Sequence, residues 1–276
     1  VSRCSEYNLS MKLPVFFHVP KNAGTYITST SYYAAHELSN GNKYYVDVVK
    51  GNITFYRLIC FDQGDLNNKY KKIDSDRYQI NFEDLDLSDL KLIMIRICDA
   101  GFGCYNEDIY SSLPVDVQPY EFICLREPYD RILSLYSYIQ SAQSSKEPTH
   151  GAFGRRSFIE YLNSSQLEGS WLIRNLLNIP NEVSVEQEHF NKTCKLLDNM
   201  YVFTINNVND SVVKVFVDCY DFKFNTIQYR NVVRNQTQNK INVPFDSLDM
   251  QSKTAFLNHT SWDRQIYERY KDADIT

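Results

Sequence analysis

The segment at residues 20–25 reads Pro-Lys-Asn-Ala-Gly-Thr and carries residue types that can bind an anion. It joins an apolar run to a helical pattern, and the free N–H groups at the start of a helix attract phosphate-like groups. Gly24 allows close approach of the backbone, Thr25 adds a hydroxyl donor and Lys21 adds a positive charge. We therefore expect Lys21 to neutralise a terminal oxyanion, although a solvated loop lysine would show the same pattern.

A second segment with anion-binding chemistry, at residues 122–139, reads FICLREPYDRILSLYSYI. Arg126 ends a strand-like run, and its planar fork suits bidentate recognition of a phosphate. Ser134 lies about two helical turns further along and could donate to the same anion, while Pro128 suits the first turn of the helix. The alternative interpretation is a surface arginine paired with Glu127 or with an aspartate of the next turn.

The elements that position these residues alternate between strand-like and helical patterns. In the first half we expect, in chain order, a strand, a helix, a hairpin of two strands, two further strands and a helix, at residues 13–19, 26–38, 43–49, 53–61, 90–98, 121–125 and 129–140. Because strands recur with helical crossovers between them, the sequence predicts an α/β fold with a parallel sheet flanked by helices.

The C-terminal half is more helical. Three patterns resemble N-terminal capping boxes and predict helices near residues 158, 185 and 261: Ser157 with Glu160, Ser184 with Gln187, and Thr260 with Asp263. A further helix is expected at residues 171–178, a strand at 201–205 and a mobile loop at 141–156.

Length and charge limit the classes of function. The 276 residues are 43% hydrophobic, so we expect one domain over residues 1–276, with residues 1–12 as an N-terminal extension. The net charge of −5 provides no basic field for nucleic acid or an anionic membrane, so no nucleic-acid partner is expected. Any anion must be held locally.

Cysteine, histidine and asparagine patterns give further limits. The seven cysteines and five histidines show no spacing typical of metal ligands, and we expect no metal site. Buried thiols with one or two disulfide bridges are the expected role of the cysteines. Seven Asn-x-Ser/Thr sequons favour the secretory pathway. Because the chain begins with Val, we expect that an N-terminal membrane anchor could be missing from it.

Together the two anion-binding segments resemble the donor-binding elements of sulfotransferases that use 3′-phosphoadenosine-5′-phosphosulfate (PAPS). The first resembles their 5′-phosphosulfate-binding loop, of pattern Pro-Lys-x-x-Gly-Thr, and the second resembles their 3′-phosphate-binding element. The pattern is most similar to Golgi-type carbohydrate sulfotransferases of the 2-O-sulfotransferase group. The resemblance is strong over residues 15–27 and 122–139, and looser over 157–174 and 262–270.

The resemblance implies a P-loop-like sulfotransferase fold, PAPS as donor, adenosine 3′,5′-bisphosphate as product, no metal and a Golgi lumenal location, with the cytoplasm as the alternative. It implies that Lys21 also acts in catalysis by stabilising the leaving oxygen. His18 could contact ligand, although a packed strand histidine is the simpler interpretation. The donor-binding residues that it implies are Lys21, Asn22, Ala23, Gly24, Thr25, Tyr26, Arg126 and Ser134, with Arg230 and Arg234 in a late basic segment.

The acceptor implied is a hydroxyl, on a carbohydrate or a small molecule, and the acidic chain leads us to expect a neutral or lightly charged one. Relatives carry a Gly-His-x-x-x-Gly-like segment whose histidine is the catalytic base. The corresponding segment here, RICDAGFGCY at residues 96–105, has no histidine, and Asp99 falls at that position. Asp99 is therefore the expected base and Glu107 the second choice, while a turn aspartate at a strand end is the alternative.

Two other functions fit parts of the pattern. A small-molecule kinase would use residues 92–99 as a Walker-B-like strand, but its P-loop carries the lysine after the glycines, whereas Lys21 precedes Gly24. A degenerate sulfotransferase fold could act as a binding module if the base is absent. Nucleotide binding with and without magnesium would distinguish a kinase from a sulfotransferase. Turnover of PAPS would distinguish an active sulfotransferase from a binding module.

Overall fold

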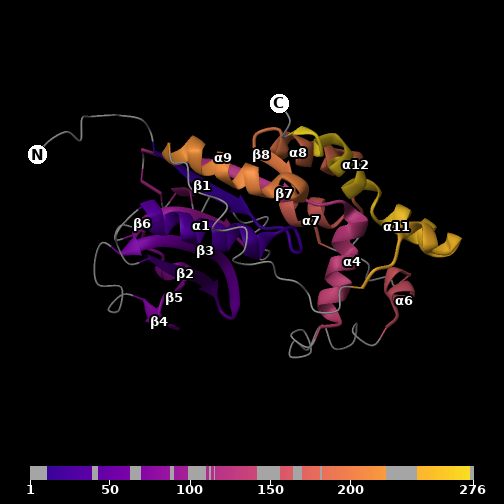
Figure 1. Cartoon of the computed structure of the whole chain (residues 1–276), viewed down its shortest axis with the longest axis horizontal. Helices are drawn as coiled ribbons and strands as arrows, with labels where there is room; N and C mark the ends of the chain where they lie inside the picture. Colours follow the sequence, from indigo (N-terminus) through magenta and orange to yellow (C-terminus); the bar gives the residue numbers. More distant parts are fainter. Residues whose placement is uncertain are drawn as a thin grey trace, which may run out of the picture.

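A mixed sheet of eight strands forms the centre of the molecule, with helices on both faces (Figure 1). The computed structural model describes residues 11–38, 43–62, 70–87, 90–98, 110–111, 113–114, 116–141, 156–163, 170–180, 182–221 and 241–273. The strands are β1 (Met11–Phe17), β2 (Lys43–Lys50), β3 (Ile53–Asp62), β4 (Lys71–Lys72), β5 (Arg77–Asn81), β6 (Leu90–Ile97), β7 (Val117–Leu125) and β8 (Tyr201–Thr204).

Helices make up most of the described residues in the second half of the chain, as the sequence predicts. The α-helices are α1 (Gly24–Leu38), α4 (Pro128–Ile139), α6 (Phe158–Leu162), α7 (Trp171–Leu177), α8 (Gln187–Leu197), α9 (Val208–Tyr220), α11 (Met250–His259) and α12 (Ser261–Tyr270). Three short 3₁₀ helices are η1 (Phe82–Asp84), η4 (Ile205–Asn207) and η5 (Phe245–Ser247).

The strand order is β4-β5-β2-β3-β6-β1-β7-β8. Four neighbouring strands are parallel, since β1 pairs with β6 and β7, and β7 pairs with β8. The α/β fold with flanking helices is confirmed, but the sheet is mixed, so the prediction of a parallel sheet holds only for part of it. β2 and β3 form the expected hairpin through a tight turn at Gly51, whose φ is +61°, and so short a connection returns the strand antiparallel. β3 then pairs antiparallel with β6.

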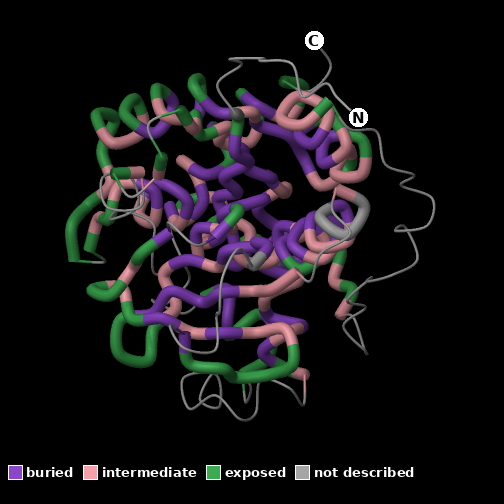
Figure 2. The backbone as a smooth tube through the Cα atoms, turned by 90° about the vertical axis from the view of Figure 1, so that its left-hand side faces the viewer, coloured by how far each residue is buried: buried purple, intermediate pink, exposed green. Residues whose placement is uncertain are grey.

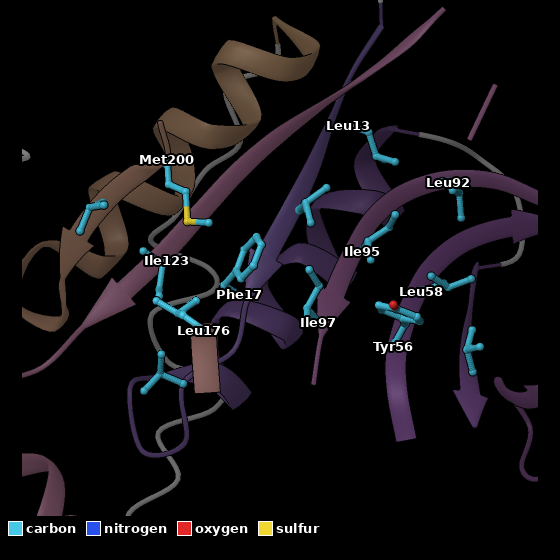
Figure 3. Close-up of a cluster of buried hydrophobic side chains, with 14 of the residues drawn as sticks. Leu13, Phe17, Tyr56, Leu58, Leu92, Ile95, Ile97, Ile123, Leu176 and Met200 are labelled. Atoms are coloured by element: carbon cyan, nitrogen blue, oxygen red, sulfur yellow. The ribbon is translucent and has the colours of Figure 1, made fainter. Parts of the chain in front are cut away.

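Alternation of side chains along β1 explains the two layers of helices. Phe16 faces α1 and α9, and its ring stacks on Phe122 of β7 with centroids 5.2 Å apart. Leu13 and Phe17 face the opposite side, where they join the core formed with α7, α8 and α12 (Figure 3). Because both faces are covered, the central strands are nearly continuous in apolar residues. The buried stretches accordingly lie in the middle of the molecule, with exposed turns around them (Figure 2).

A third hydrophobic cluster, separate from the cores on the two faces of the sheet, holds α4 beside the sheet. Tyr129 of α4 makes edge-to-face contacts with Phe158 of α6 and Phe256 of α11. These three helices lie together on the side of the molecule away from β2 to β5 (Figure 1). The cluster fixes the direction in which the chain continues after β7.

Of the three predicted capping boxes, one is confirmed. Ser157 Oγ accepts from the Glu160 N–H at 3.2 Å, and the Glu160 carboxylate accepts from the Ser157 N–H at 2.6 Å. The box predicted at residues 184–187 is wrong, because helix α8 begins at Gln187 and is capped by Glu186.

The third box is also wrong, although α12 begins at Ser261 as predicted. The Thr260 hydroxyl donates to the Phe256 carbonyl at 2.7 Å, at the end of the preceding helix, so it does not cap α12.

Several elements were not predicted, namely β4, β5, α9 and α11. Helix α9 is rich in valine, which favours strands when read locally, but its apolar face packs on β1 and β7. Most of the loop predicted at residues 141–156 lies outside the described residues.

The cysteines that the structure describes are free thiols, and those at positions 60, 124 and 194 are buried as expected; no disulfide joins any of these residues. Within the described parts of the chain, no helix is both long and apolar enough to cross a membrane.

Candidate anion-binding site

The carboxyl ends of β1 and β7 form a topological switch point. These strands are parallel neighbours, yet the chain leaves them toward opposite faces of the sheet. Helix α1, which follows β1, packs on one face, whereas α7 and α8, which follow β7 by way of α4, pack on the other. In open α/β sheets the crevice at such a point is the usual ligand site. Lys21 follows β1 and Arg126 follows β7, so both predicted cations lie there.

Two hydrogen bonds tie the predicted anion-binding segments to each other. Arg126 donates from Nη1 to the Lys21 carbonyl at 3.2 Å. Asn22 donates from Nδ2 to the Cys124 carbonyl at 2.9 Å, with only 2% of its surface exposed. The loop after β1 and the end of β7 therefore form one unit. The side chain of Asn22 serves this connection, so a direct ligand contact would come from its backbone.

The backbone of the loop is strained before helix α1 begins. Lys21 and Ala23 adopt φ values of +67° and +60°, a left-handed conformation that costs free energy for residues other than glycine. Such conformations persist where surrounding contacts enforce them, and they cluster at ligand sites. At Gly24, a Cβ atom would lie 1.9 Å from His18 Cδ2, so only glycine fits beneath the first turn of α1.

The site holds two cations close together. Burial lowers the pKa of Lys21, and the positive charge of Arg126 lowers it further. Burial also lowers the pKa of Arg126, while nearby Asp130 and Glu127 act in the opposite direction. Within the described part of the chain, neither cation forms an ion pair with a carboxylate. Lys21 Nζ instead lies 4.4 Å from the centroid of the Tyr138 ring. An anion bound here would offset both the desolvation and the repulsion.

The guanidinium of Arg126 keeps one edge available. Nη1 is used by the Lys21 carbonyl, and the buried Nε has no hydrogen-bond partner among the described residues. Arg126 and Asn22 both line a small pocket, and Oδ1 of Asn22 is likewise buried without a partner in the described chain. Elsewhere, Arg57 binds Asp47 through Nε and Nη2 at 2.6 and 3.2 Å, which shows how this edge holds an oxyanion. Arg126 could bind a phosphate in the same way.

The remaining predicted residues are arranged differently. Ser134 is half-buried on α4, one turn before Tyr138, and so lies on the helix face that contacts Lys21. Thr25 is exposed in the first turn of α1, whereas Tyr26 turns toward α9 and donates its hydroxyl to Asn209. The predicted Asp99, Glu107, Arg230 and Arg234 lie outside the described residues.

Sequence reasoning missed three features of the site: the Asn22 link to β7, the ring of Tyr138 at Lys21, and the contact between His18 and Arg96. Arg96 Nη2 lies 3.0 Å from His18 Nδ1. The sequence does contain a signal for the last of these contacts. Arg96 is a charged residue within the apolar run of β6, and a half-buried charge requires a polar partner.

Comparison with known proteins does not assign a family. No family model matches the chain, and searches of curated proteins and of solved structures gave no match.

Proposed function

We propose that this protein is a PAPS-dependent sulfotransferase that transfers a sulfuryl group to an acceptor hydroxyl. A carbohydrate is the first candidate for the acceptor, and a small alcohol is the second. The observation that carries the proposal is the pair of half-buried cations, Lys21 and Arg126, joined at the switch point of the sheet. PAPS carries a phosphosulfate at one end and a 3′-phosphate at the other. Two cations on adjacent strand ends suit a ligand with two separated anionic groups.

The assignment of each end follows from the local chemistry. Lys21 precedes the N-terminus of α1, where free N–H groups and the helix dipole favour the phosphosulfate. Arg126 offers a planar edge, and Ser134 lies on the adjoining helix, which favours the 3′-phosphate. The hydrogen bond between Arg126 and the Lys21 backbone fixes the spacing between the two positions.

In the proposed reaction, the acceptor oxygen bonds to sulfur as the bond from sulfur to the leaving phosphate oxygen breaks. The ammonium of Lys21 stabilises the charge that develops on the leaving oxygen, and the N–H groups at the start of α1 stabilise the sulfuryl oxygens. The acceptor proton passes to a base, for which Asp99 is our candidate. The alignment of donor and acceptor supplies the rest of the rate enhancement.

Ligand-dependent thermal stability tests the donor class. A ligand that binds only the folded state raises the melting temperature, and the increase grows with the ratio of ligand concentration to dissociation constant. We expect stabilisation by adenosine 3′,5′-bisphosphate without magnesium and none by ATP with magnesium. The reverse result would support the kinase alternative and overturn the proposal.

Turnover of radiolabelled PAPS with an acceptor panel tests the reaction itself. Transfer of label to a neutral or lightly charged glycan, or to a small alcohol, is the expected result. Nucleotide binding without transfer to any acceptor would favour a binding module, and preferential labelling of heparan-like chains would contradict the expected acceptor.

A lumenal location in the secretory pathway, with the Golgi as the compartment, is part of the proposal. The sequons at Asn52, Asn191 and Asn258 have exposed asparagine side chains, so a glycan could be attached there without unfolding. Asn209 is half-buried against Tyr26 and is a poorer site. Enzymatic removal of N-linked glycans from protein secreted by eukaryotic cells should therefore reduce its apparent mass, and an unchanged mass would favour the cytoplasm.

A further inference from the structure

The hydrogen bond between Arg96 and His18 determines where the histidine carries its proton. Arg96 Nη2 lies 3.0 Å from His18 Nδ1, and a guanidinium can only donate. Nδ1 must therefore accept, which leaves the proton of the neutral imidazole on Nε2. A proton on Nδ1 would remove this hydrogen bond, and an imidazolium protonated on both nitrogens would also place a second positive charge beside the guanidinium.

Arg96 is itself fixed by the first turns of α1. Its Nη1 donates to Thr28 Oγ1 at 3.3 Å, and the Thr28 hydroxyl donates to the Gly24 carbonyl at 2.8 Å. On the sheet, Arg96 lies directly opposite Phe16 in the parallel pairing of β6 with β1. The guanidinium thus joins β6, the end of β1 and helix α1.

The other edge of the imidazole supports the anion-binding loop. A Cβ atom on Gly24 would lie 1.9 Å from His18 Cδ2 and 2.0 Å from Nε2. Real Cβ atoms do not approach so closely, so the ring occupies the space in which a side chain at residue 24 would lie. The position of the ring therefore sets how closely the first turn of α1 approaches the end of β1.

We infer that Arg96 holds His18 as the neutral tautomer protonated at Nε2, and that His18 positions the first turn of α1 rather than serving as the base. Both ring nitrogens are committed, because the Nδ1 lone pair faces Arg96 and Nε2 carries the proton. The part of the inference that concerns the base rests on the proposed sulfotransferase function, whereas the tautomer and the packing do not.

Nitrogen NMR of the imidazole tests the tautomer without any ligand. In ¹⁵N-labelled protein at pH 7, the resonances of His18 should show a protonated Nε2 and an unprotonated Nδ1. Arg96→Met should abolish the preference, because it removes the guanidinium that donates to Nδ1. A cationic His18, or one protonated at Nδ1 in the unmodified protein, would overturn the inference.

A compensating pair of substitutions tests the packing. Gly24→Ala should weaken binding of adenosine 3′,5′-bisphosphate by about tenfold or more, since displacing the loop costs its hydrogen bonds to the ligand. His18→Ala makes room for the new methyl group, so the double variant should bind more tightly than Gly24→Ala alone. Gly51→Ala is the comparison variant, because its Cβ would meet nothing within 4 Å, so the strain of its φ of +61° is a cost that His18→Ala should not relieve. A double variant no better than Gly24→Ala would contradict the packing role.

Thermal unfolding of the same variants separates this inference from the proposed function. If the unmodified protein does not bind the nucleotide, the sulfotransferase proposal fails, but Gly24→Ala should still lower the melting temperature and His18→Ala should still restore it in part. If Gly24→Ala is as stable as the unmodified protein, the inference fails whatever the ligand. Added imidazole should not restore turnover to His18→Ala, and restoration would identify His18 as a base.

Discussion

Arg126 donates to the backbone carbonyl of Lys21 at 3.2 Å, although the two residues are 105 positions apart in the chain. The contact makes the two cations of the site interdependent. A ligand group that moves the guanidinium also moves the loop at Lys21, and the repulsion between their charges is part of the reason that the pKa of Lys21 is lowered. If the protein binds the proposed donor, we expect recognition of its two ends to be coupled through this pair.

Lys21→Ala should reduce sulfuryl transfer by about 10²-fold or more, because it removes a positive charge from the leaving oxygen. The fold should persist, since the side chain of Lys21 makes no hydrogen bond to the described protein and the loop is held by Asn22. Turnover of radiolabelled PAPS and a thermal melt measure the two effects. Lys192→Ala is the control, because that lysine forms an exposed ion pair on α8. Normal turnover in Lys21→Ala would refute the assignment.

Arg126→Met should weaken the binding of adenosine 3′,5′-bisphosphate by about tenfold or more, because the loss of a charge-assisted hydrogen bond has an effect of that size. Adenosine 5′-phosphate lacks the 3′ group and should lose much less affinity. Ser134→Ala should follow the same pattern with a smaller loss. Calorimetric titration of both nucleotides measures the difference, with the exposed Arg269→Met as control. Equal losses for the two nucleotides would show that Arg126 does not bind the 3′-phosphate.

The lowered pKa of Lys21 predicts a pH dependence of anion binding. An anion binds best when Lys21 is charged, so affinity should begin to fall at a pH below the ordinary lysine value of 10.5, and binding in that range should take up a proton. Arg126→Met removes the neighbouring charge and should move the fall to higher pH. Titrations in buffers of different ionisation enthalpy detect the proton. Affinity that stays constant up to pH 10.5 would contradict this prediction.

The lowered pKa of Lys21 also makes the free energy of unfolding depend on pH. Between the lowered pKa and 10.5, the unfolded chain binds more protons than the folded protein at this residue. The contribution of Lys21 to the free energy of unfolding therefore increases as the pH rises through that window.

Two alanine-to-glycine substitutions in neighbouring segments should have opposite effects on stability. Ala23 has a φ of +60°, which costs about 1–2 kcal/mol for a residue with a Cβ atom, whereas glycine adds roughly 0.5–1 kcal/mol of unfolded-state entropy. Ala23→Gly should therefore raise the free energy of unfolding by up to about 1 kcal/mol. Ala34→Gly, at a buried position inside α1, should lower it by about 1 kcal/mol. Denaturant unfolding compares them, and a loss of stability in Ala23→Gly would show that the loop is not strained.

The sequence predicted the central elements because their signals are local. The apolar runs of β1, β6 and β7, the hairpin turn at Gly51 and the proline that starts α4 each identify an element from a few residues. The strand order could not be read, since pairing β3 with β6 depends on contacts between distant segments. Helix α9 was missed because its valines favour a strand until the sheet beneath it is known.

In the candidate site, too, the residues with local sequence signals could be predicted, whereas the contacts between distant segments could not. Lys21, Gly24 and Arg126 could be identified because they lie in short patterns with a defined chemistry. The contacts that orient them, from Asn22 to β7 and from Arg96 to His18, join segments 102 and 78 residues apart and leave no local pattern.

The base remains a prediction from sequence alone, and substitution can test it. Asp99 follows the end of β6 by two positions, and β6 ends beside β1, next to the proposed phosphosulfate site. Asp99→Asn should retain adenosine 3′,5′-bisphosphate binding but lose turnover by about 10²-fold or more, the scale of general-base catalysis. Glu107→Gln is the matched comparison, since it removes the second candidate carboxylate. If Glu107→Gln loses turnover while Asp99→Asn keeps it, the proton passes to Glu107; and if both keep it, neither carboxylate is the base.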